Sequence, residues 1–227
     1  PCSGCLGYNG GPVMHDPKVY LVFWGPTWPT GAIPAMQALF AELAGGMYNN
    51  ILTQYYDNNG PIHNDTTWAG TFMDNSTPPA SLTMSRIGQE AASVLSANGR
   101  TNDSNTLVLV FPQNGSTYDS SIAASICGEH NYAPPGNSTL IYGFVRYAGC
   151  NDTQNPFTAM QYYAAHEYAE AVTDPQPFKG WVNGSQEIGD LCNKGGQTYS
   201  PVDHTYVQPP SSPPPPQPQL WVTSLWD

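Results

Sequence analysis

Basic side chains are scarce in this chain, whose 227 residues include six lysines and arginines against 17 aspartates and glutamates. The formal net charge is therefore -11 at pH 7. Binding to nucleic acid depends on clustered Lys and Arg, and so does attraction to an anionic membrane surface. We therefore expect neither nucleic acid nor a membrane among the partners of this protein.

Long apolar runs are missing as well, since no stretch approaches the roughly 20 residues that a bilayer-spanning helix needs. The Gly-x-Ser-x-Gly elbow of serine hydrolases and the Gly-rich loop that holds phosphate groups are both absent. No Cys-His pair has local support for a thiol protease. The chain is nevertheless long enough for a full hydrophobic core, and we expect a single domain over residues 1–227.

Sequons and cysteines indicate an extracellular protein. Asn-x-Ser/Thr sequons are more frequent than the roughly three that the composition would produce by chance. They begin at Asn64, Asn75, Asn102, Asn114, Asn137, Asn151 and Asn183. Five cysteines are present, and in an oxidising compartment Cys127 and Cys150 are the first candidates for a disulfide. We therefore predict a secreted glycoprotein with a Cys127–Cys150 disulfide.

Apolar and aromatic runs predict the framework of the fold. Buried strands are expected at 18–24, 106–111 and 139–147, and helices at 34–56, 81–95 and 157–173. Asn183-Gly184 predicts a hairpin over 181–186. Two further strands are expected at 205–208 and 220–225, with the proline run 209–218 between them as an extended loop. This order predicts an α+β fold, with a mixed β-sheet and one principal helix packed beside it.

The helix expected at 157–173 carries His166-Glu167-Tyr168-Ala169-Glu170, which is close to the helical signature of zinc hydrolases. A carboxylate stands where the second histidine would be. Residues i and i+4 share a face of a helix, so His166 and Glu170 can hold one metal ion while Glu167 handles the proton of a water molecule. A solvated His–Glu pair is the simpler interpretation, but the helix has little other charge and several tyrosines, which predicts burial. Buried carboxylates need a cation or protons, and we therefore expect a zincin-like fold with 157–173 as a long active-site helix.

A third ligand is expected from Glu187-Ile188-Gly189-Asp190, which follows the predicted hairpin. If this segment is extended, Glu187 and Asp190 point to opposite faces and only one of them can bind the metal. If it is a helical turn, one acid can bind the metal while the other orients His166. The sequence leaves both arrangements open, so Glu187 and Asp190 are both candidate ligands.

The expected ligand set is one histidine plus carboxylates. Carboxylate oxygens are harder Lewis bases than the imidazole nitrogens of the usual two-histidine zinc site. Zn²⁺ is the first choice, with Mn²⁺ and Ca²⁺ as alternatives. Asp174 lies one helical step further along the same face and is a candidate member of a calcium-like cluster. His130 and His204 are outside candidates for a nitrogen ligand, but we expect each to be a hydrogen-bonded structural or surface histidine.

Four sequence blocks follow one another between residues 10 and 192. They are Gly10-Gly11-Pro12-Val13-Met14-His15-Asp16-Pro17-Lys18-Val19-Tyr20, then Cys127-Gly128-Glu129-His130, then the stretch 166–175, then Glu187-Ile188-Gly189-Asp190-Leu191-Cys192. In this combination the chain resembles the phosphate-induced protein 1 / EXORDIUM family of secreted plant proteins and its bacterial and fungal relatives. The resemblance implies an extracellular or wall-associated protein, with cell-wall glycan as a candidate partner, and it implies no established reaction.

The leading hypothesis is a secreted, monomeric zinc metallopeptidase that acts on a peptide or protein substrate. His166 and Glu170 would bind the metal, Glu187 or Asp190 would complete the site, and Glu167 would be the general base. The alternative is a non-catalytic extracellular or cell-wall binding or signalling protein with a structural metal ion. A third hypothesis is a carbohydrate-active enzyme in which Glu167 and either Glu187 or Asp190 flank a sugar bond.

Overall fold

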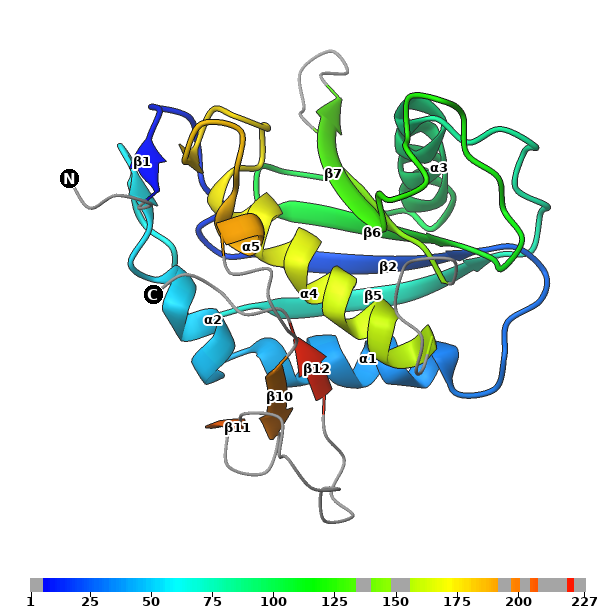
Figure 1. Ribbon diagram of the computed structural model, residues 1–227, viewed down its shortest axis with the longest axis horizontal. Helices are drawn as coiled ribbons and strands as arrows, with labels where there is room; N and C mark the ends of the chain where they lie inside the picture. Colours follow the sequence, from blue (N-terminus) through cyan, green and yellow to red (C-terminus); the bar gives the residue numbers. More distant parts are fainter. Residues whose placement is uncertain are drawn as a thin grey trace.

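The computed structural model describes residues 6–133, 140–147 and 156–191, and beyond them the backbone of three short strands. A five-stranded sheet lies at its centre (Figure 1). In spatial order its strands are β5 (Thr67–Asp74), β2 (Lys18–Trp24), β6 (Thr106–Pro112), β8 (Leu140–Val145) and β7 (Gly128–Ala133). The first four run parallel, and β7 runs antiparallel to β8 at one edge. The chain is therefore a mixed α/β protein, and the predicted mixed sheet is confirmed.

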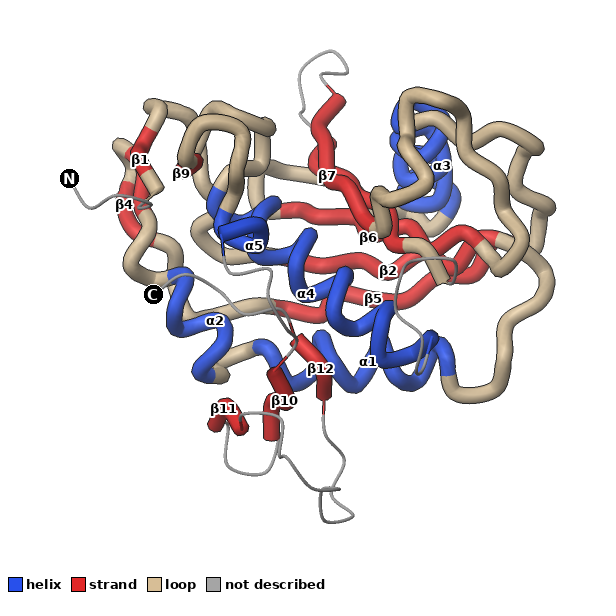
Figure 2. Tube along the Cα trace, in the orientation of Figure 1, coloured by secondary structure: helices blue, strands red, loops and turns tan. Residues whose placement is uncertain are grey.

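Helices cover both faces of this sheet (Figures 1 and 2). One side carries three helices and the other side one: α1 (Ala32–Leu43), α2 (Met47–Leu52) and α4 (Pro156–Thr173) against α3 (Met84–Ala97). Alternate residues of β2 serve the two cores, since Val19 and Leu21 pack in the core of α1 and α4, whereas Tyr20 and Val22 pack in that of α3. A parallel strand buried on both faces needs an unbroken apolar run, which is the pattern that predicted β2 and β6.

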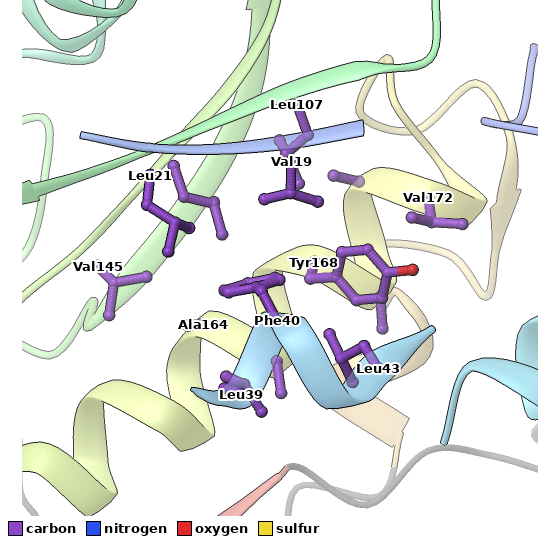
Figure 3. Packing of buried hydrophobic residues seen from close by; sticks show 14 of the residues in the cluster. Val19, Leu21, Leu39, Phe40, Leu43, Leu107, Val145, Ala164, Tyr168 and Val172 are labelled. Atoms are coloured by element: carbon purple, nitrogen blue, oxygen red, sulfur yellow. The ribbon is translucent and has the colours of Figure 1, made fainter. Parts of the chain in front are cut away.

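Helix α4 is buried on nearly all sides, and every residue from Ala164 to Thr173 is buried. Figure 3 shows Tyr168 of α4 between the side chains of α1 and those of the sheet. The hydroxyl of Tyr168 donates a hydrogen bond to Asn49 Oδ1 at 2.5 Å and also contacts the hydroxyl of Thr66. A helix buried all round has no solvated face. Its polar side chains must therefore find partners inside the protein.

The predicted helix 34–56 forms two helices instead of one. They are separated at Gly45-Gly46, where Gly45 has a φ of 69°, a conformation that favours glycine. The helix predicted at 81–95 is α3, and its N-terminus is capped by the side chain of Thr83, which accepts a hydrogen bond from the Arg86 N–H. Glycine thus interrupts a periodic pattern that otherwise indicates one long helix.

Short strands and one helical turn complete the fold. β1 (Gly7–Tyr8) pairs with β9 (Trp181–Val182), and β3 (Tyr56–Asp57) pairs with β4 (Gly60–Pro61). β10 (Gln197–Ser200) pairs with both β11 (Thr205–Val207) and β12 (Leu220–Val222). β11 and β12 lie within the strands predicted at 205–208 and 220–225. The predicted loop 209–218 lies outside the described residues. The Asn-Gly hairpin is present as an antiparallel bridge between Asn183 and Gln186. α5 (Ile188–Leu191) follows it.

Two sequence predictions concern cysteines and membranes. Cys127 precedes β7, and the other four cysteines lie outside the described residues, so the Cys127–Cys150 disulfide stays a prediction. No helix in the described part of the chain combines the length and apolar character needed to cross a bilayer.

Candidate metal centre

Three polar residues of α4 face a cavity of about 320 Å³. Its lining comes from α4, the edge strand β7, residues 177–178 after α4, and the segment of α5. His166, Glu167 and Glu170 all line it, and all three are buried. The interpretation of His166 and Glu170 as solvated side chains is therefore wrong.

Helical spacing places His166 and Glu170 side by side, as predicted. Nε2 of His166 lies 2.9 Å from Oε1 of Glu170. This oxygen nevertheless has no hydrogen-bond partner, and neither has Nδ1 of His166. Burial alone lowers the pKa of His166, but the carboxylates of Glu170, Glu167 and Asp190 outweigh it and raise that pKa to about 9. The pair thus brings a nitrogen and an oxygen atom close together on one side of the helix.

Asp190 joins this pair from α5, which packs beside the C-terminal half of α4 (Figure 1). The segment is a helical turn and not extended, but the other acid, Glu187, lies at His130 and does not orient His166. Asp190 Oδ2 accepts a hydrogen bond from the backbone N–H of Glu187, and its Oδ1 lies 3.8 Å from Nε2 of His166. One ligand atom from each of His166, Glu170 and Asp190 falls within 4.8 Å of the other two.

Glu187, the other candidate ligand, lies elsewhere in the cluster. Its Oε1 is 3.5 Å from Nε2 of His130 and has no hydrogen-bond partner. Burial raises the pKa of Glu187 to about 9; the charge of His130 opposes this rise, and the negative charges of Glu170 and Asp174 add to it. The structure therefore groups Asp190, and not Glu187, with His166 and Glu170.

His130, which the sequence offered only as an outside candidate for a nitrogen ligand, belongs to this centre. It lies on β7, is only 3% exposed, and its Nε2 is 2.9 Å from the backbone carbonyl oxygen of Asp174. Nδ1 lies 3.6 Å from Glu167 Oε2 and 3.8 Å from Glu170 Oε2. Burial lowers the pKa of His130, but the surrounding carboxylates of Glu187, Glu167 and Glu170 raise it to about 10. Of the two expected kinds, His130 is a hydrogen-bonded structural histidine and not a surface one, and His204 lies outside the described residues.

Two other sequence candidates have different positions. Asp174 accepts hydrogen bonds from the backbone N–H groups of Phe178, Lys179 and Gly180, at 2.5, 3.0 and 2.5 Å. Its carboxylate thereby closes the turn that follows α4. Asp174 is in neither of the two groups with metal-ligand spacing, which are His166, Glu170 and Asp190, and His130, Glu167 and Glu170. Glu167 lies against β7, where a Cβ on Gly128 would come within 2.5 Å of Glu167 Oε1. Glycine at 128 therefore gives this carboxylate its space.

The donor set fits a divalent cation. Oε2 of Glu167, Oε1 of Glu170 and Oε1 of Glu187 are buried without hydrogen-bond partners. Burial also raises the pKa of Glu167, and the charge of Glu170 adds to this effect. Buried carboxylates without partners are costly unless a cation or protons compensate them. A tetrahedral zinc site places its ligand atoms roughly 3.4 Å apart, and the spacings of 2.9 and 3.8 Å around His166 bracket that value.

Comparisons of the chain with protein-family models, with curated proteins and with solved structures find no match. The resemblance to the EXORDIUM family therefore stays a prediction.

Proposed function

We propose that this protein is a metal-dependent hydrolase of zincin-like fold, most simply a peptidase. His166, Glu170 and Asp190 hold the metal, and Glu167 is the general base. One observation carries the proposal: all four side chains line the same cavity, and the first three have ligand atoms within reach of one ion. A cavity at the ligands gives a substrate access to the metal. The mixed sheet with α4 packed beside it supports the zincin-like assignment.

A catalytic role is favoured over a structural ion by the number of ligands. Within the described residues, the group around His166 contains three protein ligands and no fourth. Structural zinc sites are closed by four protein ligands, whereas catalytic sites use three and keep one position for water or substrate. The proposal of a non-catalytic protein with a structural ion requires a fourth ligand from another part of the chain.

The residues of the site have two separate roles in hydrolysis, metal binding and proton transfer. A divalent cation bound by the three ligands would lower the pKa of a water molecule towards about 7 and polarise a substrate carbonyl group. Glu167 accepts the proton of that water and returns it to the leaving amine. Its Oε2 has no hydrogen-bond partner among the described residues, so it can take up a proton.

The ligand set also determines which metal ions suit the site and how fast turnover is expected to be. Two carboxylates and one histidine suit Zn²⁺ first, with Mn²⁺ and Ca²⁺ as alternatives. Two anionic ligands reduce the Lewis acidity of the cation compared with a two-histidine site. We therefore expect modest turnover or narrow specificity.

Secretion is part of the same proposal. Five of the sequons lie in the described residues, and none of their asparagines is buried: Asn64, Asn75, Asn102, Asn114 and Asn183. Glycosylation needs such accessible asparagines. An extracellular peptidase acting on peptide or cell-wall protein is consistent with these positions.

The test is the pair of variants Glu167→Gln and Glu129→Gln. Glu129 lines the same cavity but belongs to neither ligand group. Glu129→Gln therefore makes the same chemical change at a control position. Each protein is assayed for cleavage of a peptide library and for bound metal by elemental analysis. The proposal predicts that Glu167→Gln loses turnover, by about 100-fold or more, and keeps its metal. Undiminished cleavage by Glu167→Gln, or no cleavage by any zinc-loaded form, would overturn the assignment.

A further inference from the structure

The two carboxylate oxygens of Glu170 face different histidines. Oε1 lies 2.9 Å from Nε2 of His166, on the side of α5. Oε2 lies 3.8 Å from Nδ1 of His130, on the side of β7. A carboxylate placed between two nitrogen donors in this way has the arrangement of a bridging ligand, in which each oxygen binds its own cation.

His130 is oriented as metal-binding histidines are. Its Nε2 lies 2.9 Å from the carbonyl oxygen of Asp174, which can only accept, so Nε2 carries the hydrogen. In the neutral ring Nδ1 then has the lone pair, and this nitrogen points towards Glu167 and Glu170. Ligating histidines usually donate their other ring N–H to a carbonyl or carboxylate in this manner.

We propose that His130 Nδ1, Glu167 Oε2 and Glu170 Oε2 form a second divalent-cation position, with Glu170 bridging it to the first. One ligand atom from each residue lies within 4.8 Å of the other two. Nδ1 is 3.6 and 3.8 Å from the two oxygens, close to the roughly 3.4 Å between ligand atoms of a tetrahedral zinc site. Glu167 is 3% exposed and its Oε2 has no hydrogen-bond partner. This buried, unpartnered oxygen points to a ligand independently of the spacing.

The charge of the cluster calls for more than one divalent cation. Glu167, Glu170, Glu187 and Asp190 all line the cavity, and among the described residues only Asp190 of these four accepts a hydrogen bond from a backbone N–H, whereas Asp174 accepts three. A first divalent cation offsets two of these negative charges, and a second offsets the other two. Protonation of the carboxylates that the first cation does not neutralise is the alternative to a second cation. A metal titration distinguishes these two alternatives.

The two positions differ in affinity and in effect. Two divalent cations that share Glu170 repel each other, so the second binds more weakly than the first. The second cation takes Glu167 as a ligand, which removes the general base. If the proposed hydrolase function holds, metal in excess of one equivalent is therefore inhibitory, and His130→Asn relieves the inhibition.

Zn²⁺ titration of metal-free protein by isothermal calorimetry tests the second position without reference to activity. Wild type should bind about two equivalents, one tight and one weaker. His130→Asn should keep the tight equivalent and lose the weaker one, Glu170→Gln should lose both, and the exposed His63→Asn should behave as wild type. One equivalent in wild type and in His130→Asn would overturn the second position and leave the proposed function intact. Two equivalents in His130→Asn would also overturn it, and no binding at all would overturn both proposals.

Bridging has a readout that does not depend on how well a variant folds. Wild-type protein loaded with two equivalents of Mn²⁺ should show the electron paramagnetic resonance spectrum of two coupled ions, and one equivalent should show an isolated ion. Two equivalents of magnetically isolated Mn²⁺ would show that Glu170 does not bridge them.

Discussion

Gly189 lies directly against His166, because a Cβ atom at position 189 would come within 2.7 Å of His166 Nδ1. The same Cβ would lie 2.8 Å from Oε1 of Glu170. Gly189 does not have a positive φ, so space, and not backbone conformation, calls for glycine here. The absence of a side chain lets α5 pack onto α4 and carry Asp190 to the other two ligands.

Gly189→Ala is therefore expected to weaken metal binding by about tenfold or more, because the methyl group separates α5 from both His166 and Glu170. Gly7→Ala is the matched control, since a Cβ there makes an ordinary contact of 3.7 Å with the carbonyl oxygen of Val182. The measurement is the zinc dissociation constant by competition with a chelating dye. Equal affinities for the two variants would show that α5 contributes nothing to the site.

The two acids of the α5 segment should behave differently on neutralisation. Asp190→Asn removes a ligand and should weaken the tight zinc site by about 100-fold or more. Glu187→Gln makes the same type of change at a residue that is 3.5 Å from His130 and outside the His166 group, so the tight equivalent should be retained. Calorimetry on both variants measures this. The reverse order of affinities would make Glu187 the third ligand.

The apolar patterns predicted much of the fold, because they report burial directly. Strands such as β2 and β6 and the helix α4 lie within a few residues of their expected positions. The split of 34–56 into α1 and α2 depends on the left-handed conformation of Gly45, which periodicity does not register. His166, Glu167 and Glu170 were predictable together because helical spacing alone places them in one region.

The remainder of the centre depends on contacts between segments that are distant in the chain. His130 reaches the cluster because β7 pairs antiparallel with β8 at the edge next to α4, and no local spacing rule encodes that pairing. The choice between Glu187 and Asp190 depends on whether their segment is extended or helical. Asp190 Oδ2 accepting from the Glu187 N–H closes the helical turn and turns Oδ1 towards His166.

Away from the metal centre, Glu90 should make stability depend on pH. Burial raises its pKa from the ordinary 4.5 to about 8, helped by the hydrogen bond and negative charge of Asp74. Between these two values the folded state holds a proton that the unfolded state releases, so stability falls as the pH rises from about 4.5 to about 8. Glu90→Gln should reduce this fall, whereas the exposed Asp65→Asn should not. Urea unfolding of all three proteins at pH about 4.5 and about 8 measures the free energy of unfolding at both ends of this range. An unchanged pH dependence in Glu90→Gln would show that Glu90 does not cause the fall in stability.

The most direct test of the metal site at His166 is the metal content of purified protein after dialysis against metal-free buffer. Wild type, His166→Ala and the exposed-site control His63→Ala are compared by elemental analysis, with circular dichroism to confirm that each is folded. About one zinc per chain is expected in wild type and in His63→Ala, and none in His166→Ala. A wild-type protein that binds no divalent cation, or a His166→Ala protein that keeps its metal, would contradict this expectation.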